Sequence, residues 1–118
     1  LLALAAGAWL ALRAHARQHI RLRVRNASSE PFAHVWQGHP QRGTDIDLGP
    51  LAPGETSRWH TLPAVLPHYR KTRVQLARRQ VTGTLQGQAL LPGSYTFVCT
   101  IAPHDGGLRV VAAREKRN

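Results

Sequence analysis

The chain has 118 residues and a formal net charge of +10, with 16 Lys and Arg residues against 6 Asp and Glu residues. This length corresponds to one domain, and a composition of 42% hydrophobic and 19% charged residues excludes both a disordered polar chain and a polytopic membrane protein. A single Cys excludes an internal disulfide and a zinc site built from Cys-x-x-Cys pairs.

Residues 1–12 form the first distinct segment, because they carry no charge and are followed by Arg13 and Arg17. A surface helix would present a polar face, which this run lacks. The run has the length of the apolar core of a signal peptide (~7–15 residues), whereas a membrane-spanning helix needs ~20. We therefore predict an apolar helix over residues 1–18, either a truncated membrane anchor or a signal segment, with the membrane as a partner through residues 1–12.

From residue 19 the hydrophobic pattern changes to an alternation with a period of two. Ile20, Leu22 and Val24 alternate with arginines, which is typical of a strand with one buried face. Further strands are predicted over residues 32–36, 45–48, 56–62, 70–77, 79–85, 95–101 and 108–113, separated by turn-forming sequences. Seven or eight short strands over residues 19–114, with turns every ~8–12 residues, predict an all-β, antiparallel, immunoglobulin-like or cupredoxin-like sandwich, with a small barrel as the alternative. Residues 115–118 are predicted to form a short tail after the domain.

Four large aromatic side chains are expected to form much of the core of this domain. Aromatic residues supply a large share of the buried area in small proteins. The four are Trp36, Trp59, Tyr95 and Phe97.

The sequence around the single Cys suggests a metal site. Residues 92–108 resemble the last strand and ligand loop of cupredoxins, in which a strand ending in Cys is followed by His and then Met. The resemblance implies a copper ion held by His34, Cys99 and His104, since such a site needs a thiolate and two imidazoles. Leu108 stands where the axial Met would be, and the chain contains no Met. Under the alternative interpretation, Cys99 is a small buried side chain on the inner face of its strand and His104 belongs to a hairpin turn.

A second resemblance extends over residues 20–114. The strand at 20–26, the turn sequences at 47–51 and 53–56, and the Leu-Pro-Gly-Ser-Tyr-Thr-Phe sequence at 91–97 are similar to those of small uncharacterised bacterial envelope proteins. Those proteins are anchored at the N-terminus by a lipid or a single helix. The resemblance implies a non-enzymatic, membrane-tethered domain outside the cytoplasm, in the periplasm, that serves as an interaction or accessory module for a protein partner in the envelope.

Two further features of the sequence bear on function. It contains no phosphate-binding glycine loop, nucleophile elbow or zinc-protease motif, so we do not expect an enzyme. Its basic charge attracts nucleic acid or anionic lipid headgroups, but the stacking aromatics of a single-strand binder are scattered here, so nucleic acid is not an expected partner. The arginines expected on one basic face near anionic headgroups are Arg21, Arg23, Arg25 and Arg109.

Overall fold

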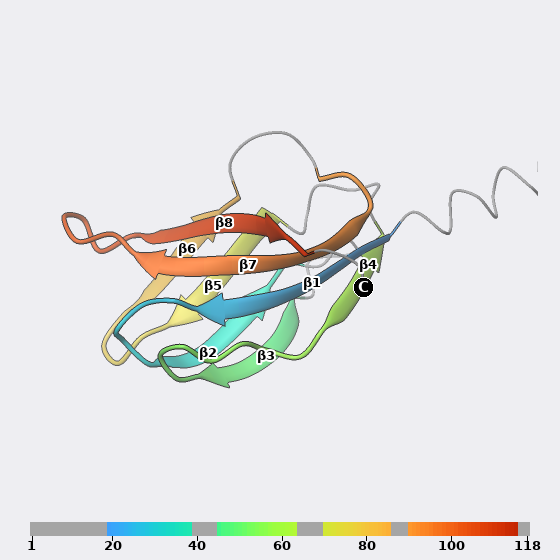
Figure 1. Ribbon diagram of the computed structural model, residues 1–118. Coiled ribbons are helices and arrows are strands. Elements are labelled where there is room, and N and C mark those ends of the chain that lie inside the picture. Colours follow the sequence, from blue (N-terminus) through green and yellow to red (C-terminus); the bar gives the residue numbers. More distant parts are fainter. Residues whose placement is uncertain (1–18, 39–44, 64–69, 86–89, 116–118) are drawn as a thin grey trace, which may run out of the picture.

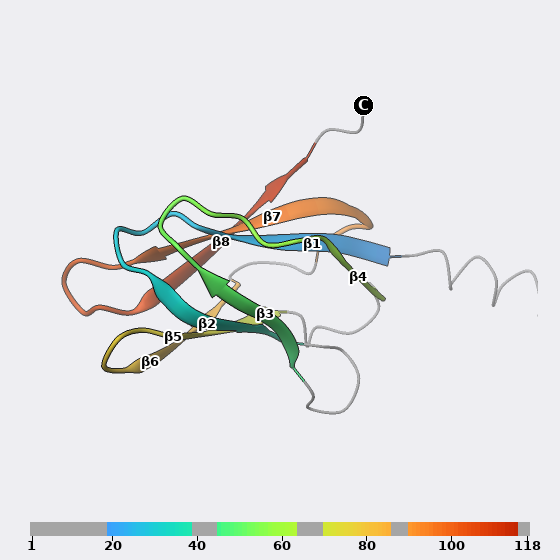
Figure 2. The same cartoon turned by 90° about the horizontal axis from the view of Figure 1, so that it is seen from below.

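The protein folds as a β-sandwich of two four-stranded sheets (Figures 1 and 2). The computed structural model describes residues 19–38, 45–63, 70–85 and 90–115. Among these residues all regular structure is β-strand apart from one 3₁₀ position, and no helix is long and apolar enough to cross a membrane. The helix expected over residues 1–18 and the end of the tail, residues 116–118, lie outside the described residues.

The eight strands fall close to the predicted positions. They are β1 (His19–Asn26), β2 (Phe32–Gln37), β3 (Ile46–Leu51), β4 (His60–Pro63), β5 (Lys71–Gln75), β6 (Gln80–Thr84), β7 (Gly93–Ile101) and β8 (Leu108–Arg114). One sheet has the order β4-β1-β7-β8 and the other the order β3-β2-β5-β6. The two layers are separated in Figure 2, where β1 and β7 lie above β2, β5 and β6.

The expectation of a fully antiparallel sandwich is wrong in one place, because β1 and β7 run parallel in the centre of their sheet. The other five strand pairs are antiparallel. After β1 the chain crosses to the second sheet at β2 and returns to the first only later, so β7 can enter beside β1 in the same direction. Alternation of apolar and polar residues is the same in either case, so the sequence pattern carries no signal for strand direction.

The core lies between the two sheets and is built by the inward residues of each strand. Ile20, Leu22 and Val24 are fully buried, as the alternation predicts. On the neighbouring strand Phe97 is fully buried and Tyr95 is 5% exposed, which confirms both as core residues. Complete burial of one such side chain contributes ~1.5–3 kcal/mol.

The placement of both tryptophans in the core is wrong. Trp36 alternates with the buried Val35, so its half-buried ring lies on the outer face of its sheet. Trp59 lies just before β4 and is half-buried beside the outward arginines of β1. Each tryptophan therefore shapes a surface of the sandwich rather than its interior.

Asn26 at the end of β1 is a fully buried polar residue that ties three segments together. Its Nδ2 atom donates to the carbonyl oxygens of Glu30 and Leu51, at 2.8 and 3.0 Å. Its Oδ1 atom accepts hydrogen bonds from the backbone N–H and the hydroxyl of Ser28, at 2.9 and 2.7 Å. All the hydrogen-bonding groups of the amide side chain are thus used, which is the condition for burying it at low cost.

Candidate functional site

The three residues of the copper hypothesis lie in different environments. Cys99 on β7 is fully buried in the core, and this burial raises the pKa of its thiol to about 12. His34 lies on the outer face of β2, in the opposite sheet, where its Nε2 atom is 2.5 Å from Asp47 Oδ1. His104 is exposed in the turn between β7 and β8.

The structure does not bring these residues together as a ligand set. In the described part of the chain no group of three or more His, Cys, Asp or Glu side chains could hold a metal ion. A copper thiolate also requires a deprotonated sulfur, which the buried position of Cys99 disfavours. The alternative interpretation is confirmed for both residues, because Cys99 faces inward and His104 lies in the turn.

A second candidate site is formed by the outward residues of the β4-β1-β7-β8 sheet. Arg21, Arg23 and Arg25 alternate with the buried residues of β1, and Arg109 alternates with the buried residues of β8. The strand register aligns Arg25 with Val98, and Val98 in turn with Val111. We call this surface, made of the four arginines with Trp59 and Val111, the arginine face.

Trp59 is flanked by two guanidinium groups on this face. The Cζ atoms of Arg21 and Arg23 lie 4.3 and 4.4 Å from the centroid of its ring. At this distance a guanidinium is attracted by the electron-rich face of the indole. The pairing of β4 with β1, which aligns Thr61 with Arg21, holds Trp59 beside these two arginines. The indole and the two cations therefore form one preformed cluster.

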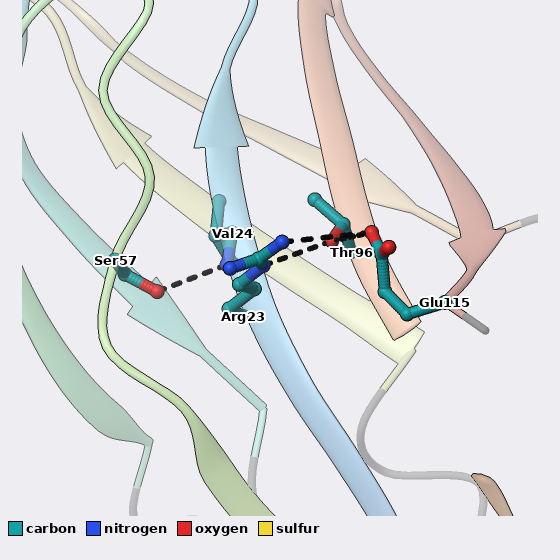
Figure 3. A network of polar contacts seen from close by, with 5 residues as sticks. All are labelled: Arg23, Val24, Ser57, Thr96 and Glu115. Carbon is teal, nitrogen blue, oxygen red and sulfur yellow. Dashed lines mark hydrogen bonds and ion pairs between the residues drawn. The ribbon is translucent and has the colours of Figure 1, made fainter. Parts of the chain in front are cut away.

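Arg23 is the arginine on this face that has an acidic partner (Figure 3). Its Nε atom donates to the hydroxyl of Thr96 at 3.0 Å, and this hydroxyl donates to Oε1 of Glu115 at 2.5 Å. The Nη2 atom of Arg23 lies 3.7 Å from the same carboxylate oxygen. Among the described residues no carboxylate lies within ion-pair distance of Arg21, Arg25 or Arg109.

The outer face of the β3-β2-β5-β6 sheet has a different charge arrangement. Arg73 lies 3.5 Å from a carboxylate oxygen of Asp45 and stacks over Trp36, with its Cζ atom 4.5 Å from the ring centroid. On the same tryptophan the His34 ring stacks at 4.4 Å and contacts Asp47. The backbone N–H of residue 49 donates to Asp47 and, with His34, lowers the pKa of that carboxyl group. On this face Arg73 and His34 each have a carboxylate partner, whereas the outward Lys71 of β5 has no carboxylate within ion-pair distance among the described residues.

Two polar side chains, Ser57 and His60, lie beside β1 near the arginine face. The hydroxyl of Ser57 accepts a hydrogen bond from the N–H of Val24 at 2.9 Å (Figure 3). It also donates one to the carbonyl of Arg58 at 2.9 Å. These bonds fix the segment that crosses from β3 to β4. His60 on β4 is half-buried, and this burial together with the nearby Arg58 lowers the pKa of its imidazole.

Comparisons of the sequence do not add a functional assignment. No protein-family model matches the chain, and no curated protein matches it. The clustering of Trp59 with Arg21 and Arg23 was missed by the sequence analysis, which expected this tryptophan in the core. No spacing in the sequence indicates this cluster, because Trp59 comes close to Arg21 only once β4 has paired with β1.

Proposed function

We propose that this protein is a non-enzymatic interaction module of the bacterial cell envelope. In this proposal residues 1–12 tether it to the inner membrane, and the β-sandwich lies on the periplasmic side as an accessory domain. The arginine face is its contact surface.

The observation that supports the proposal is the contrast between the two outer faces of the sandwich. Arg21, Arg25 and Arg109 of the arginine face have no acidic partner among the described residues. On the opposite face Arg73 is paired with Asp45 and His34 with Asp47, and Lys71 is the outward cation there that lacks a carboxylate partner in the described part of the chain. Unpaired arginines gathered on one face raise the local potential and attract anionic partners.

The apolar character of residues 1–12 supports the tether. These residues lie outside the described part of the chain, and β1 follows them after six further residues. The first exposed arginine of the face, Arg21, is thus nine positions beyond the apolar run. A tether of this length keeps the sandwich close to the membrane surface.

Fractionation of the full chain tests this proposal. When it is expressed in a Gram-negative host, we expect the protein in the membrane pellet after extraction with alkaline carbonate. A protease added to spheroplasts is expected to degrade the β-domain, while a cytoplasmic marker stays intact. Recovery of the protein in the soluble fraction, or protection of the domain in intact spheroplasts, would contradict the tether or the periplasmic side, respectively.

A further inference from the structure

We infer that the arginine face binds the phosphate groups of anionic phospholipids, so that the sandwich lies with this face on the membrane that carries it. The inference rests on the proposed function and names the partner of the same surface. It also assigns a role to Glu115, as an internal competitor of the lipid phosphate for Arg23.

The first support is the combination of charge and shape. The Cα atoms of Arg21, Arg23 and Arg25 follow one another along one strand at intervals of ~7 Å, and neighbouring strands lie ~4.8 Å apart, so that the basic side chains stand on an open pleated surface. Arg109 extends this surface to the edge strand β8. A spread of cations suits a planar array of headgroup phosphates. Each Arg near such a surface strengthens binding about fivefold.

The second support is the apolar component of the face. Val111 is 64% exposed and aligned with Val98, which in turn is aligned with Arg25. Trp59 adds an indole, an amphipathic ring that is enriched at the level of lipid headgroups. An exposed valine and a tryptophan among arginines match the mixed polar and apolar character of a membrane interface.

The third support is the geometry of the Trp59 cluster. The Cζ atoms of Arg21 and Arg23 lie over the indole ring, and a guanidinium in this position still has N–H groups that can bind an oxyanion. A guanidinium binds phosphate through two parallel hydrogen bonds when its donors are available. Arg21 has no ion pair in the described part of the chain, whereas Arg23 contacts Glu115 at 3.7 Å. A lipid phosphate that binds Arg23 must therefore displace Glu115, whereas one that binds Arg21 displaces no carboxylate.

The test uses the full chain reconstituted into vesicles and a single tryptophan as the probe. A chain with Trp9→Phe and Trp36→Phe retains Trp59, and the matched chain with Trp9→Phe and Trp59→Phe retains Trp36 on the opposite face. Quenching by a headgroup-spin-labelled phosphatidylcholine is measured in phosphatidylcholine vesicles with and without phosphatidylglycerol. We expect phosphatidylglycerol to increase the quenching of Trp59 and not that of Trp36, and added salt to reverse the increase.

Charge variants of the Trp59 chain then identify the residues responsible. We expect Arg21→Gln with Arg25→Gln to reduce the ratio of membrane-facing to free domain about 25-fold, because each arginine contributes a factor of about five. The control, Lys71→Gln with Arg78→Gln, removes the same charge away from the face and is expected to change the ratio less than twofold. Glu115→Gln is expected to increase the ratio, since it removes the competitor for Arg23.

Several results would overturn the inference. They are quenching of Trp36 in place of Trp59, equal quenching of Trp59 with and without phosphatidylglycerol, equal effects of the two double variants, and tighter binding of a single-stranded oligonucleotide than of anionic vesicles. A vesicle flotation assay distinguishes lipid binding by the arginine face from anchoring by residues 1–12. A chain that does not float with pure phosphatidylcholine vesicles contradicts the tether, and its flotation with phosphatidylglycerol vesicles alone would still support the arginine face.

Discussion

Arg23 and Thr96 are register partners in the parallel β1–β7 pair, and the Nε atom of Arg23 donates to the Thr96 hydroxyl at 3.0 Å. The one parallel ladder of the sandwich thus sets the position of the central arginine of its basic face. Because Thr96 also donates to Glu115, the hydroxyl links β1 to the residue that follows β8. The Thr96 hydroxyl thus connects two strands, β1 and β7, with the residue after β8.

Replacing Thr96 by Val tests this link. The change keeps the shape of the side chain but removes the hydroxyl between Arg23 and Glu115, so we expect the free energy of unfolding to fall by about 1 kcal/mol. Thr96→Ser keeps the hydroxyl and is the matched control. The measurement is urea denaturation followed by circular dichroism. A loss confined to Thr96→Ser, which lacks the methyl group but keeps the hydroxyl, would contradict the role of the hydroxyl.

Asn26 is expected to be the most sensitive polar position of the fold. Asn26→Ala leaves the carbonyls of Glu30 and Leu51 without their side-chain donor, and each lost buried hydrogen bond costs ~1–3 kcal/mol. We expect a total loss of about 2–4 kcal/mol in denaturant unfolding. Ser29→Ala, an exposed change in the same turn, is the control and should stay within ~0.5 kcal/mol of the parent. A loss below about 1 kcal/mol for Asn26→Ala would contradict this role.

The buried thiol of Cys99 predicts both low reactivity and a pH dependence. In the unfolded chain a Cys thiol titrates near 9.0, whereas in the folded protein burial raises the pKa of Cys99 to about 12. Its stabilising contribution is therefore complete below pH ~9 and is lost as the pH rises toward 12, by at most ~1.4 kcal/mol per pH unit.

We expect Cys99→Ala to have a shallower fall of unfolding free energy across this alkaline range than the parent chain. A thiol-specific disulfide reagent should label Cys99 only after addition of guanidinium chloride. Rapid labelling of the native protein at pH 8 would contradict the buried position.

Gly83 on β6 allows the edges of the two sheets to approach each other. A Cβ atom at this position would lie 2.7 Å from the carbonyl oxygen of Leu108 and 2.9 Å from a methyl carbon of Val110, both on β8. Because the first of these atoms belongs to the backbone, the strands must separate to accept it. We expect Gly83→Ala to lower the midpoint of thermal unfolding, with a loss of about 1–3 kcal/mol, and Thr82→Ala on the exposed side of β6 to cost less than ~1 kcal/mol. A stable Gly83→Ala variant would mean that the β6–β8 contact is looser than described.

The sequence pattern predicts the strands well because alternation is a local property. The inward positions of Ile20 and Cys99 follow from counting every second residue in their strands. The same count fails at Trp36, because counting every second residue from the buried Phe32 places this tryptophan on the inner face. A register shift in β2 between Phe32 and Val35 lets both of these residues face inward, and alternation alone does not predict such a shift.

The candidate site was predicted only in part. The outward positions of Arg21, Arg23 and Arg25 follow from the alternation, but their contacts depend on strands that are distant in sequence. Glu115 reaches Arg23 only because β7 lies between β1 and β8, and the parallel pairing behind this order leaves no mark on the hydrophobic pattern. The three residues of the copper hypothesis lie apart for a similar reason, because the local sequence around Cys99 does not indicate on which sheet the distant His34 will lie.

The most direct test of membrane binding by the arginine face is to measure the orientation of the sandwich on an anionic bilayer. The full, isotopically labelled chain is placed in nanodiscs that contain phosphatidylglycerol and a lipid with a paramagnetic headgroup, and line broadening is recorded for each backbone amide. We expect broadening at the amides of Arg21, Arg25 and Val111, with the amides of Trp36 and Arg73 unaffected. Broadening confined to the opposite sheet, or spread evenly over both, would contradict membrane binding by the arginine face.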